Sequence, residues 1–304
     1  MLAKEDISEE VVILSLVSFV RVSDRSYNAL KEAIEKSLKL IDFNFNKGVK
    51  NIVIKPNMCY YFHPSTGEVT DPWFVSVLID VLRDGFGNDP EIFIVESDAS
   101  AMKCRYAFRM LGYDDMVKKK GVKLVNLSKE KSRVVDIEVD GENFRFYVPE
   151  LFDGCDFVVN VPKLKYMSDV KITCALKNMY GCNAYEKKFV YHRALDEAIV
   201  GINKLIRTNL VVVDGLFVRG KFTKKLNLVM SGTDFVALDA AASRILGFNP
   251  RSVRQIVLAS RHGMGSLNFV PVGDFSYVMK AFPRKNLKDN LREVTALAYM
   301  RIMH

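Results

Sequence analysis

The sequence lacks the features that mark several large classes of protein. Its 304 residues hold no apolar run close to the roughly 18 residues of a membrane-spanning helix. Its five cysteines are widely spaced and odd in number, which argues against a disulfide framework. The first ten residues contain four acidic side chains and no cleavable signal pattern. From these absences we expect a cytoplasmic protein with no membrane partner.

The common catalytic signatures are also missing. The chain has no G-x-S-x-G elbow, no phosphate-binding P-loop and no G-x-G-x-x-G turn. An ordinary hydrolase, a P-loop ATPase and a nicotinamide dehydrogenase therefore have no support. No two cysteines form the close C-x-x-C pair that is typical of zinc or iron–sulfur ligands. Cys59, Cys174 and Cys182 would share a metal only if the fold brought them together; otherwise they are ordinary thiols.

The charge balance is basic. The chain has 44 Lys and Arg residues against 36 Asp and Glu, a formal net charge of +8. This balance favours nucleic acids, membrane surfaces or anionic metabolites as partners. The basic side chains are scattered, and no recognised nucleic-acid-binding motif interleaves them with aromatic residues. We therefore expect a small anionic ligand, and keep non-specific nucleic-acid binding as the weaker alternative.

Apolar runs alternate with amphipathic segments, as in α/β proteins. The pattern predicts strands at 11–20, 51–54, 91–95, 123–125, 157–161, 210–213 and 226–230, and helices at 26–41, 73–82, 105–111, 193–206, 236–242 and 252–260. Two further runs, 134–139 and 144–148, predict an antiparallel hairpin around Asp140-Gly141. We expect a mostly parallel sheet flanked by helices, with this small hairpin near the middle.

The chain is long enough for one large domain. Hydrophobic residues make up 49% of the sequence, and no linker-like composition divides it. We expect a single α/β domain over residues 1–304, with two lobes meeting near 140–155 as the alternative. The basic segment 275–304 predicts a C-terminal helix docked on the body. The sequence does not determine the oligomeric state.

A lysine-rich run is the most informative feature of the sequence. The predicted strand 157–161 leads into Lys163 and Lys165, which we place in a loop, and Lys177 and Asn178 follow shortly after. A solvated loop position would explain any one of these lysines. Several of them together, among apolar residues and just beyond a buried strand, indicate a site for an anion.

Polar side chains also follow three other predicted strands. Because the carboxyl ends of parallel strands share one edge of a sheet, we expect these groups to form one site with the lysine-rich run. The candidates for catalysis are Lys55, Glu96 and Asp214. The candidates for ligand binding are Asn57, Asp98, Asn160, Lys163, Lys165, Lys177 and Asn178.

Carboxylate and ammonium groups permit several chemistries at such a site. Either acidic catalytic candidate could act as a base, or could hold a divalent metal together with Asp98 and Asn57. The lysines would neutralise a carboxylate or phosphate on the substrate. A lysine desolvated beside another cation could itself be a base or a covalent nucleophile. The sequence does not choose among these chemistries.

A series of motifs carries a resemblance to a known family. In chain order they are Lys55-Pro56-Asn57, Thr70-Asp71-Pro72, Glu96-Ser97, Val161-Pro162-Lys163-Leu164-Lys165, Ala175-Leu176-Lys177-Asn178-Met179-Tyr180-Gly181, Val213-Asp214-Gly215 and Asp234-Phe235-Val236-Ala237-Leu238-Asp239. This order resembles that of domain-of-unknown-function family 362, over about residues 54–273. The resemblance adds Asp239 to the ligand-binding candidates.

The chain departs from that family's pattern in three places. Many members carry a ferredoxin-like segment with closely spaced cysteines, which implies electron transfer; this chain has none, so an iron–sulfur or redox role is only an alternative. Tyr166-Met167 stand where the family commonly has Thr-His. The glycine-rich stretch after Asp214 is reduced to Arg219-Gly220-Lys221. Our leading hypothesis is an enzyme or enzyme-like protein that binds a small anionic metabolite at the carboxyl edge of the sheet.

Overall fold

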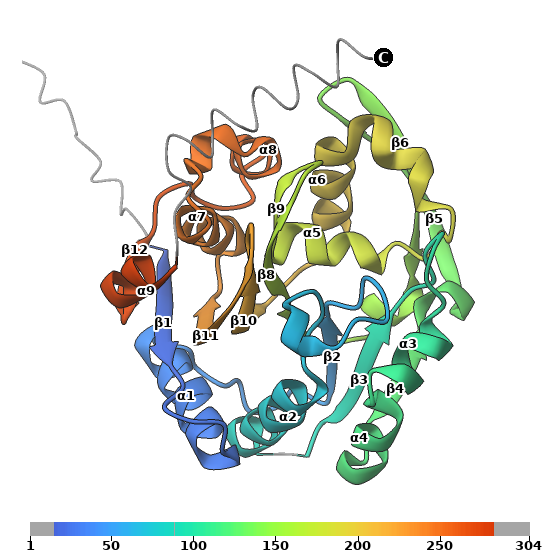
Figure 1. The fold of residues 1–304 in the computed structure, drawn as a ribbon. Helices are drawn as coiled ribbons and strands as arrows, with labels where there is room; N and C mark the ends of the chain where they lie inside the picture. The colour runs from blue at the N-terminus through green and yellow to red at the C-terminus, as the bar shows by residue number, and fades with distance from the viewer. Residues whose placement is uncertain (1–14, 88, 283–304) are drawn as a thin grey trace, which may run out of the picture.

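The computed structural model describes residues 15–87 and 89–282, with helices packed on both faces of a central sheet (Figure 1). The strands are β1 (Leu16–Arg21), β2 (Asn51–Pro56), β3 (Glu91–Glu96), β4 (Lys123–Asn126), β5 (Ser132–Val139), β6 (Glu142–Pro149), β7 (Phe157–Val161), β8 (Lys163–Met167), β9 (Lys171–Thr173), β10 (Leu210–Arg219), β11 (Thr223–Gly232) and β12 (Val270–Gly273). The α-helices are α1 (Tyr27–Leu40), α2 (Pro72–Phe86), α3 (Cys104–Met110), α4 (Tyr113–Lys120), α5 (Ala175–Met179), α6 (Leu195–Leu205), α7 (Phe235–Ile245), α8 (Arg254–Arg261) and α9 (Phe275–Ala281).

The central sheet is largely parallel. Its strand order is β12-β1-β11-β10-β7-β2-β3-β4, with β8 paired to β10 and β9 paired to β8. The neighbours from β10 through β4 all run parallel, and the register places Lys55 beside Asn160. Strand β11 is antiparallel to both β10 and β1, and β5 and β6 form a separate antiparallel hairpin. The predicted fold class is confirmed.

Successive residues of the inner strands bury their side chains on opposite faces of the sheet. Val53 belongs to the apolar cluster that includes α5 to α8, whereas Ile52 and Ile54 belong to the cluster that includes α1 to α4. All three side chains are fully shielded from solvent. Because both faces are covered, the strands appear in the sequence as continuous apolar runs, which is why most of them could be predicted.

Three helices begin directly after a residue whose side chain caps the first turn, at positions that the sequence predicts. The hydroxyl of Ser26 accepts a hydrogen bond from the N–H of Ala29 and starts α1. Asp71 caps α2 directly before Pro72, and Asp234 caps α7 by accepting from two backbone N–H groups. These signals depend only on neighbouring residues, so they are visible without the tertiary structure.

The segment that bears Lys163 and Lys165 is a strand, and the expectation of a loop is wrong. Residues 163–167 form β8, which pairs in parallel with β10 and antiparallel with β9. Both lysines are almost completely buried. The sequence suggested a loop because lysine is rarely buried without a partner, and their carboxylate partners, Asp214 and Glu68, come from distant parts of the chain.

A second correction concerns the strand that was expected to end at Val213. Strand β10 continues to Arg219, so Asp214 lies within the strand and opposite Lys163 of β8. The Asp-Gly pair suggested a turn. In the structure the register with β11 shifts at a β-bulge between Gly215 and Phe217, and the strand continues.

The two ends of the chain are described only in part. Strand β1 begins at Leu16. Residues 11–14 of the strand expected at 11–20 lie outside the described residues. Helix α9 covers Phe275–Ala281 and ends at Phe282, whose backbone is extended. Residues 283–304 of the helix predicted at 275–304 lie outside the described residues. Within the described part of the chain, no helix combines the length and hydrophobicity that crossing a membrane requires.

Candidate functional site

A cavity of about 260 Å³ lies beyond the carboxyl ends of β2 and β3. Its other walls come from β8, β9, α5 and the 3₁₀ helix η5 (Lys188–Ala194). The lining residues are Lys55, Asn57, Met58, Cys59, Glu96, Ser97, Ala99, Ser100, Ala101, Met102, Lys165, Met167, Thr173, Lys177, Asn178, Tyr180, Gly181, Lys188, Phe189 and His192. This is the edge at which α/β sheets commonly bind ligands.

Lys55 and Glu96 form a buried ion pair in the wall of this cavity. The Lys55 Nζ lies 2.8 Å from Glu96 Oε2 and also donates to the carbonyl of Pro56. A Cβ atom on Gly181 would lie 2.9 Å from both Glu96 Oε1 and Lys55 Cε. The glycine therefore leaves the space that the ion pair occupies.

Lys165 is held by acceptors from the segment that follows β2. Its Nζ lies 3.2 Å from Asn57 Oδ1, 2.8 Å from the carbonyl of Glu68 and 3.2 Å from Glu68 Oε2. It also contacts the Cys59 sulfur at 3.0 Å. Arg219 pairs with the other carboxylate oxygen of Glu68 at 2.9 Å. One carboxylate thus serves two cations, and the neighbourhood stays positively charged.

Three asparagine side chains connect the strands beneath α5. The Asn178 amide donates to Asn160 Oδ1 at 2.7 Å and to the carbonyl of Lys55 at 2.9 Å. Asn57 donates to Asn178 Oδ1 at 2.9 Å, and Asn160 donates to the carbonyl of Ala175. Asn57 and Asn178 line the cavity, whereas Asn160 lies behind them with no exposed surface. Such a satisfied network fixes the orientation of its amides.

Lys188 is a cavity residue that the sequence analysis missed. Its Nζ donates to Ser97 Oγ at 2.6 Å and to the carbonyl of Asp98 at 2.7 Å. Burial lowers the pKa of this ammonium to about 8, even though the nearby Glu96 favours the charged form. Lys188 belongs to η5, which follows no predicted strand. The local signal for it in the sequence is the pair of adjacent lysines, Lys187 and Lys188.

Lys177 differs from the other three lysines of the cavity. Lys55, Lys165 and Lys188 each contact oxygen acceptors. Among the described residues, the Lys177 ammonium instead lies over the ring of Tyr180, whose centroid is 5.5 Å from Nζ. Burial, with repulsion from Lys165, lowers the pKa of Lys177 to about 8. Its ammonium group is the one best placed to meet a ligand.

Lys163 and Asp214 form a closed pair away from the cavity lining. Their charged atoms lie 3.0 Å apart, and neither side chain has exposed surface. Among the described residues, the Lys163 ammonium forms no hydrogen bond beyond this ion pair. Asp214 also accepts from the backbone N–H groups of Asp71 and Leu216.

Two other predicted site residues cap helices rather than line the cavity. Asp98 accepts from the N–H of Cys104 at the start of α3 and from the Asn126 amide. Burial opposes ionisation of Asp98, but the hydrogen bonds from Cys104 and the nearby Lys103 ammonium outweigh it and lower the pKa of this carboxyl. Asp239 accepts from the N–H groups of Ala175 and Leu176 at the start of α5. Burial raises the pKa of Asp239 to about 7 in spite of these two donors.

The acidic and sulfur-bearing side chains do not gather into a ligand shell. In the described ranges, no three His, Cys, Asp or Glu residues are placed to hold a metal ion together. All five cysteines are free thiols; Cys59 is exposed, whereas Cys174 and Cys182 are buried. Within the described residues, the fold therefore does not meet the condition under which these three cysteines would share a metal.

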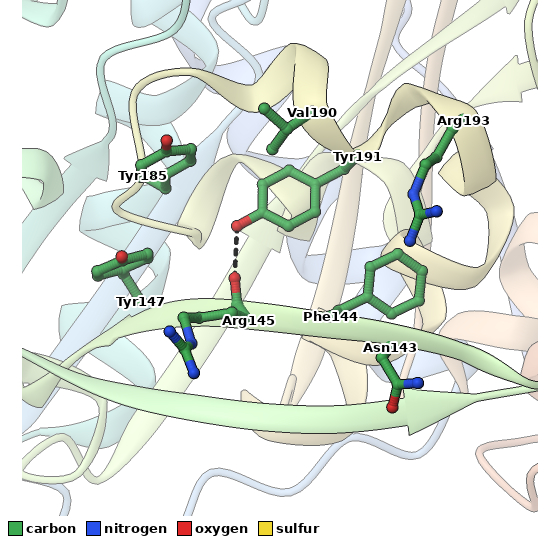
Figure 2. A pocket seen from close by; sticks show the side chains of 8 residues that line it. All are labelled: Asn143, Phe144, Arg145, Tyr147, Tyr185, Val190, Tyr191 and Arg193. Atoms are coloured by element: carbon green, nitrogen blue, oxygen red, sulfur yellow. Dashed lines mark hydrogen bonds between the residues drawn. The ribbon is translucent and has the colours of Figure 1, made fainter.

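A second hollow, of about 250 Å³, lies between β6 and η5 (Figure 2). Figure 2 shows Tyr147 and Tyr185 beside each other and the Tyr191 hydroxyl donating to the carbonyl of Arg145. Arg145 is paired with Asp136 and Arg193 with Glu142. Because both cations already have carboxylate partners, this hollow lacks the unneutralised charge of the first, which we take as the candidate site.

The fold and the cavity define an α/β protein with a lysine-rich site at the carboxyl edge of a largely parallel sheet. Residues 52–244 match the family described as "Domain of unknown function (DUF362)". The chain belongs to that family, and the resemblance seen in its motifs is confirmed.

Two individual proteins are also similar to this chain. A thylakoid-associated protein from Synechocystis sp. is 23% identical over 234 residues, which cover 73% of this chain and 70% of that protein. The structure of the lactate racemase apoprotein from Thermoanaerobacterium thermosaccharolyticum aligns with a TM-score of 0.42 and 13% identity. That alignment covers 76% of this chain and 56% of the racemase chain, and we transfer nothing of the racemase reaction.

Proposed function

We propose that this protein binds a small metabolite through its carboxylate or phosphate group in the lysine-rich cavity, and acts on it as an enzyme or enzyme-like protein. The observation that carries the proposal is the charge of the lining: two of its four lysines, Lys55 and Lys165, are paired with carboxylates, whereas Lys177 and Lys188 have no carboxylate partner among the described residues. Buried cations without matching anions are costly. A bound anion would remove that cost, so the cavity favours one.

The remaining polar groups suggest how a bound metabolite would be handled. Lys177 would contact the anionic group, with Lys165 and the Asn57 and Asn178 amides fixing its orientation. The Lys55 and Glu96 pair is our candidate for proton transfer, since both line the cavity and are already hydrogen-bonded to each other. Asp214 does not line the cavity and so has no direct part in this scheme.

Replacement of Lys177 by Met tests the proposal. We expect the affinity for inorganic phosphate or malonate to fall roughly tenfold or more, because a charge-assisted hydrogen bond is lost. The free energy of unfolding at neutral pH should rise by on the order of 1 kcal/mol, because a desolvated ammonium repelled by Lys165 is removed. Isothermal titration calorimetry and urea unfolding would measure both quantities on one protein sample.

Lys187→Met is the matched control, since it removes the same charge from an exposed side chain nearby. It should leave both quantities nearly unchanged. Equal losses of affinity in the two variants would show that only net charge matters, and unchanged binding in Lys177→Met would refute the proposal.

The affinity for the anion should also depend on pH. The pKa values of Lys177 and Lys188 are lowered to about 8 by burial, so both lysines lose their protons as the pH rises through that value. A bound anion favours the protonated forms. The affinity should therefore be highest below about pH 8 and should fall above it by up to roughly tenfold per pH unit for each lysine. Titration with malonate, which stays ionised, from pH 7 to about pH 10 would show this; a flat profile would contradict it. In Lys177→Met the slope should be shallower.

A further inference from the structure

Besides uncharged polar residues such as Asn57 and Asn178, the cavity lining has a charged part and an apolar part. The charged part comprises the four lysines and Glu96, and the apolar part comprises Met58, Ala99, Ala101, Met102, Met167 and Phe189. The two parts meet in η5, where Lys188 is buried and hydrogen-bonded while the next residue, Phe189, keeps 68% of its surface exposed. One turn of chain therefore contributes a cation and a largely exposed aromatic ring to the same cavity, and that ring lies 4.7 Å from the ring of His192.

The apolar part is held in place by backbone hydrogen bonds. Residues Ala99 and Met102 form an isolated antiparallel bridge, with N–H to carbonyl distances of 2.8 and 3.1 Å. Met58 and Met102 are themselves almost fully buried. Methionine adapts its shape to an apolar partner and makes favourable contacts with aromatic rings. The apolar part of the lining is thus already in place beside the charged part.

The cavity has room for more than an anionic group. Inorganic phosphate occupies about the volume of three water molecules, roughly 90 Å³, and the cavity measures about 260 Å³. Few uncommitted hydroxyl groups line the remainder: Ser97 Oγ already contacts Lys188, and Thr173 Oγ1 contacts the Met167 sulfur at 3.7 Å. A sugar-like body would lose hydrogen bonds to water that this wall does not replace.

We infer that the ligand is an amphipathic anion, in which a carboxylate or phosphate on the lysine side is joined to an apolar body, aryl or alkyl, that packs against Met58, Met102 and Phe189. This inference rests on the proposed anion binding and adds the kind of molecule that carries the anion. The apolar body would cover the exposed ring of Phe189, which provides a hydrophobic gain that inorganic phosphate lacks.

Two phosphate monoesters of equal charge test the inference. Phenyl phosphate carries an apolar body and glycerol phosphate a polar one, and each would be titrated into the full-length protein by calorimetry, with phenylacetate against glycolate as the carboxylate pair. We expect the aryl member to bind roughly tenfold more tightly than its polar partner. Hexyl phosphate, compared in the same way, distinguishes an alkyl from an aryl body.

Phe189→Ser should remove most of that preference, and its effect on the affinity for the aryl member should be much larger than its effect on inorganic phosphate. Phe222→Ser is the control, because Phe222 is equally exposed, at 70%, and does not line the cavity. Equal binding of the aryl and polar partners, or equal effects of the two serine variants, would overturn the inference while anion binding stands. Failure of every anion to bind, in wild type and Lys177→Met alike, would overturn the proposed function and this inference together.

Discussion

We expect Lys163→Met to lower the free energy of unfolding by about 3–5 kcal/mol, the loss typical of breaking a buried ion pair from one side. The Lys163 and Asp214 side chains have no exposed surface and lie 3.0 Å apart. Without the lysine, the Asp214 carboxylate would remain buried with only two backbone donors, from Asp71 and Leu216. Urea unfolding at neutral pH would measure the change.

A double variant separates the loss of the pair from the loss of packing. Met keeps most of the aliphatic stem of lysine, so the main penalty in Lys163→Met is the uncompensated charge. Adding Asp214→Asn removes that charge and should restore at least half of the lost free energy. A loss below about 1 kcal/mol in the single variant, accompanied by weaker phosphate binding, would instead support the role in ligand binding that the sequence suggested for Lys163.

Asp239→Ala should cost about 2–6 kcal/mol of the free energy of unfolding, because two buried N–H groups lose their acceptor at about 1–3 kcal/mol each. Those groups belong to Ala175 and Leu176, which lie 2.6 and 3.0 Å from the Asp239 oxygens. Helix α5 has no other side-chain cap and carries Lys177 and Asn178. The variant should therefore weaken phosphate binding as well, although Asp239 does not line the cavity.

Asp239→Asn provides the graded comparison. It has the same shape and keeps one acceptor oxygen, so thermal unfolding and calorimetry should place it between the wild type and Asp239→Ala in both stability and phosphate affinity. If Asp239→Ala unfolds like the wild type, the capping role is wrong. If it loses affinity with no loss of stability, the carboxylate acts on the ligand directly.

Most of the regular structure could be predicted from local patterns. The strands of the parallel sheet are apolar runs because both faces of the sheet are covered, and the starts of α1, α2 and α7 carry their own caps. Several short elements were not predicted, although the equally short α3, α8 and β4 were. Helices α4 and α5 and strands β9 and β12 have eight residues or fewer, and so short a segment does not always show a clear period.

The sequence predicted some residues that line the candidate site and others that do not. The rule that strand ends share an edge selected Lys55, Asn57 and Glu96, and the lysine-rich run selected Lys165, Lys177 and Asn178; all six line one cavity. The same rule also selected Asp98 and Asp214, whose side chains instead hold backbone N–H groups. It could not select Lys188, which follows no strand. A carboxylate after a strand looks the same in sequence whether it caps a helix or faces a ligand.

Local sequence patterns were enough to predict the class of fold, the edge of the sheet that carries the candidate site and most of the charged groups near it. These properties depend on periodicity, caps and strand ends, which are features of consecutive residues. Which lysines are neutralised became clear only from the folded chain. Glu68, Glu96 and Asp214 satisfy three of them, hydrogen bonds hold Lys188, and Lys177 faces the cavity. That division depends on distances between segments far apart in the chain, because the energy of a buried charge is set by what lies within a few ångströms of it.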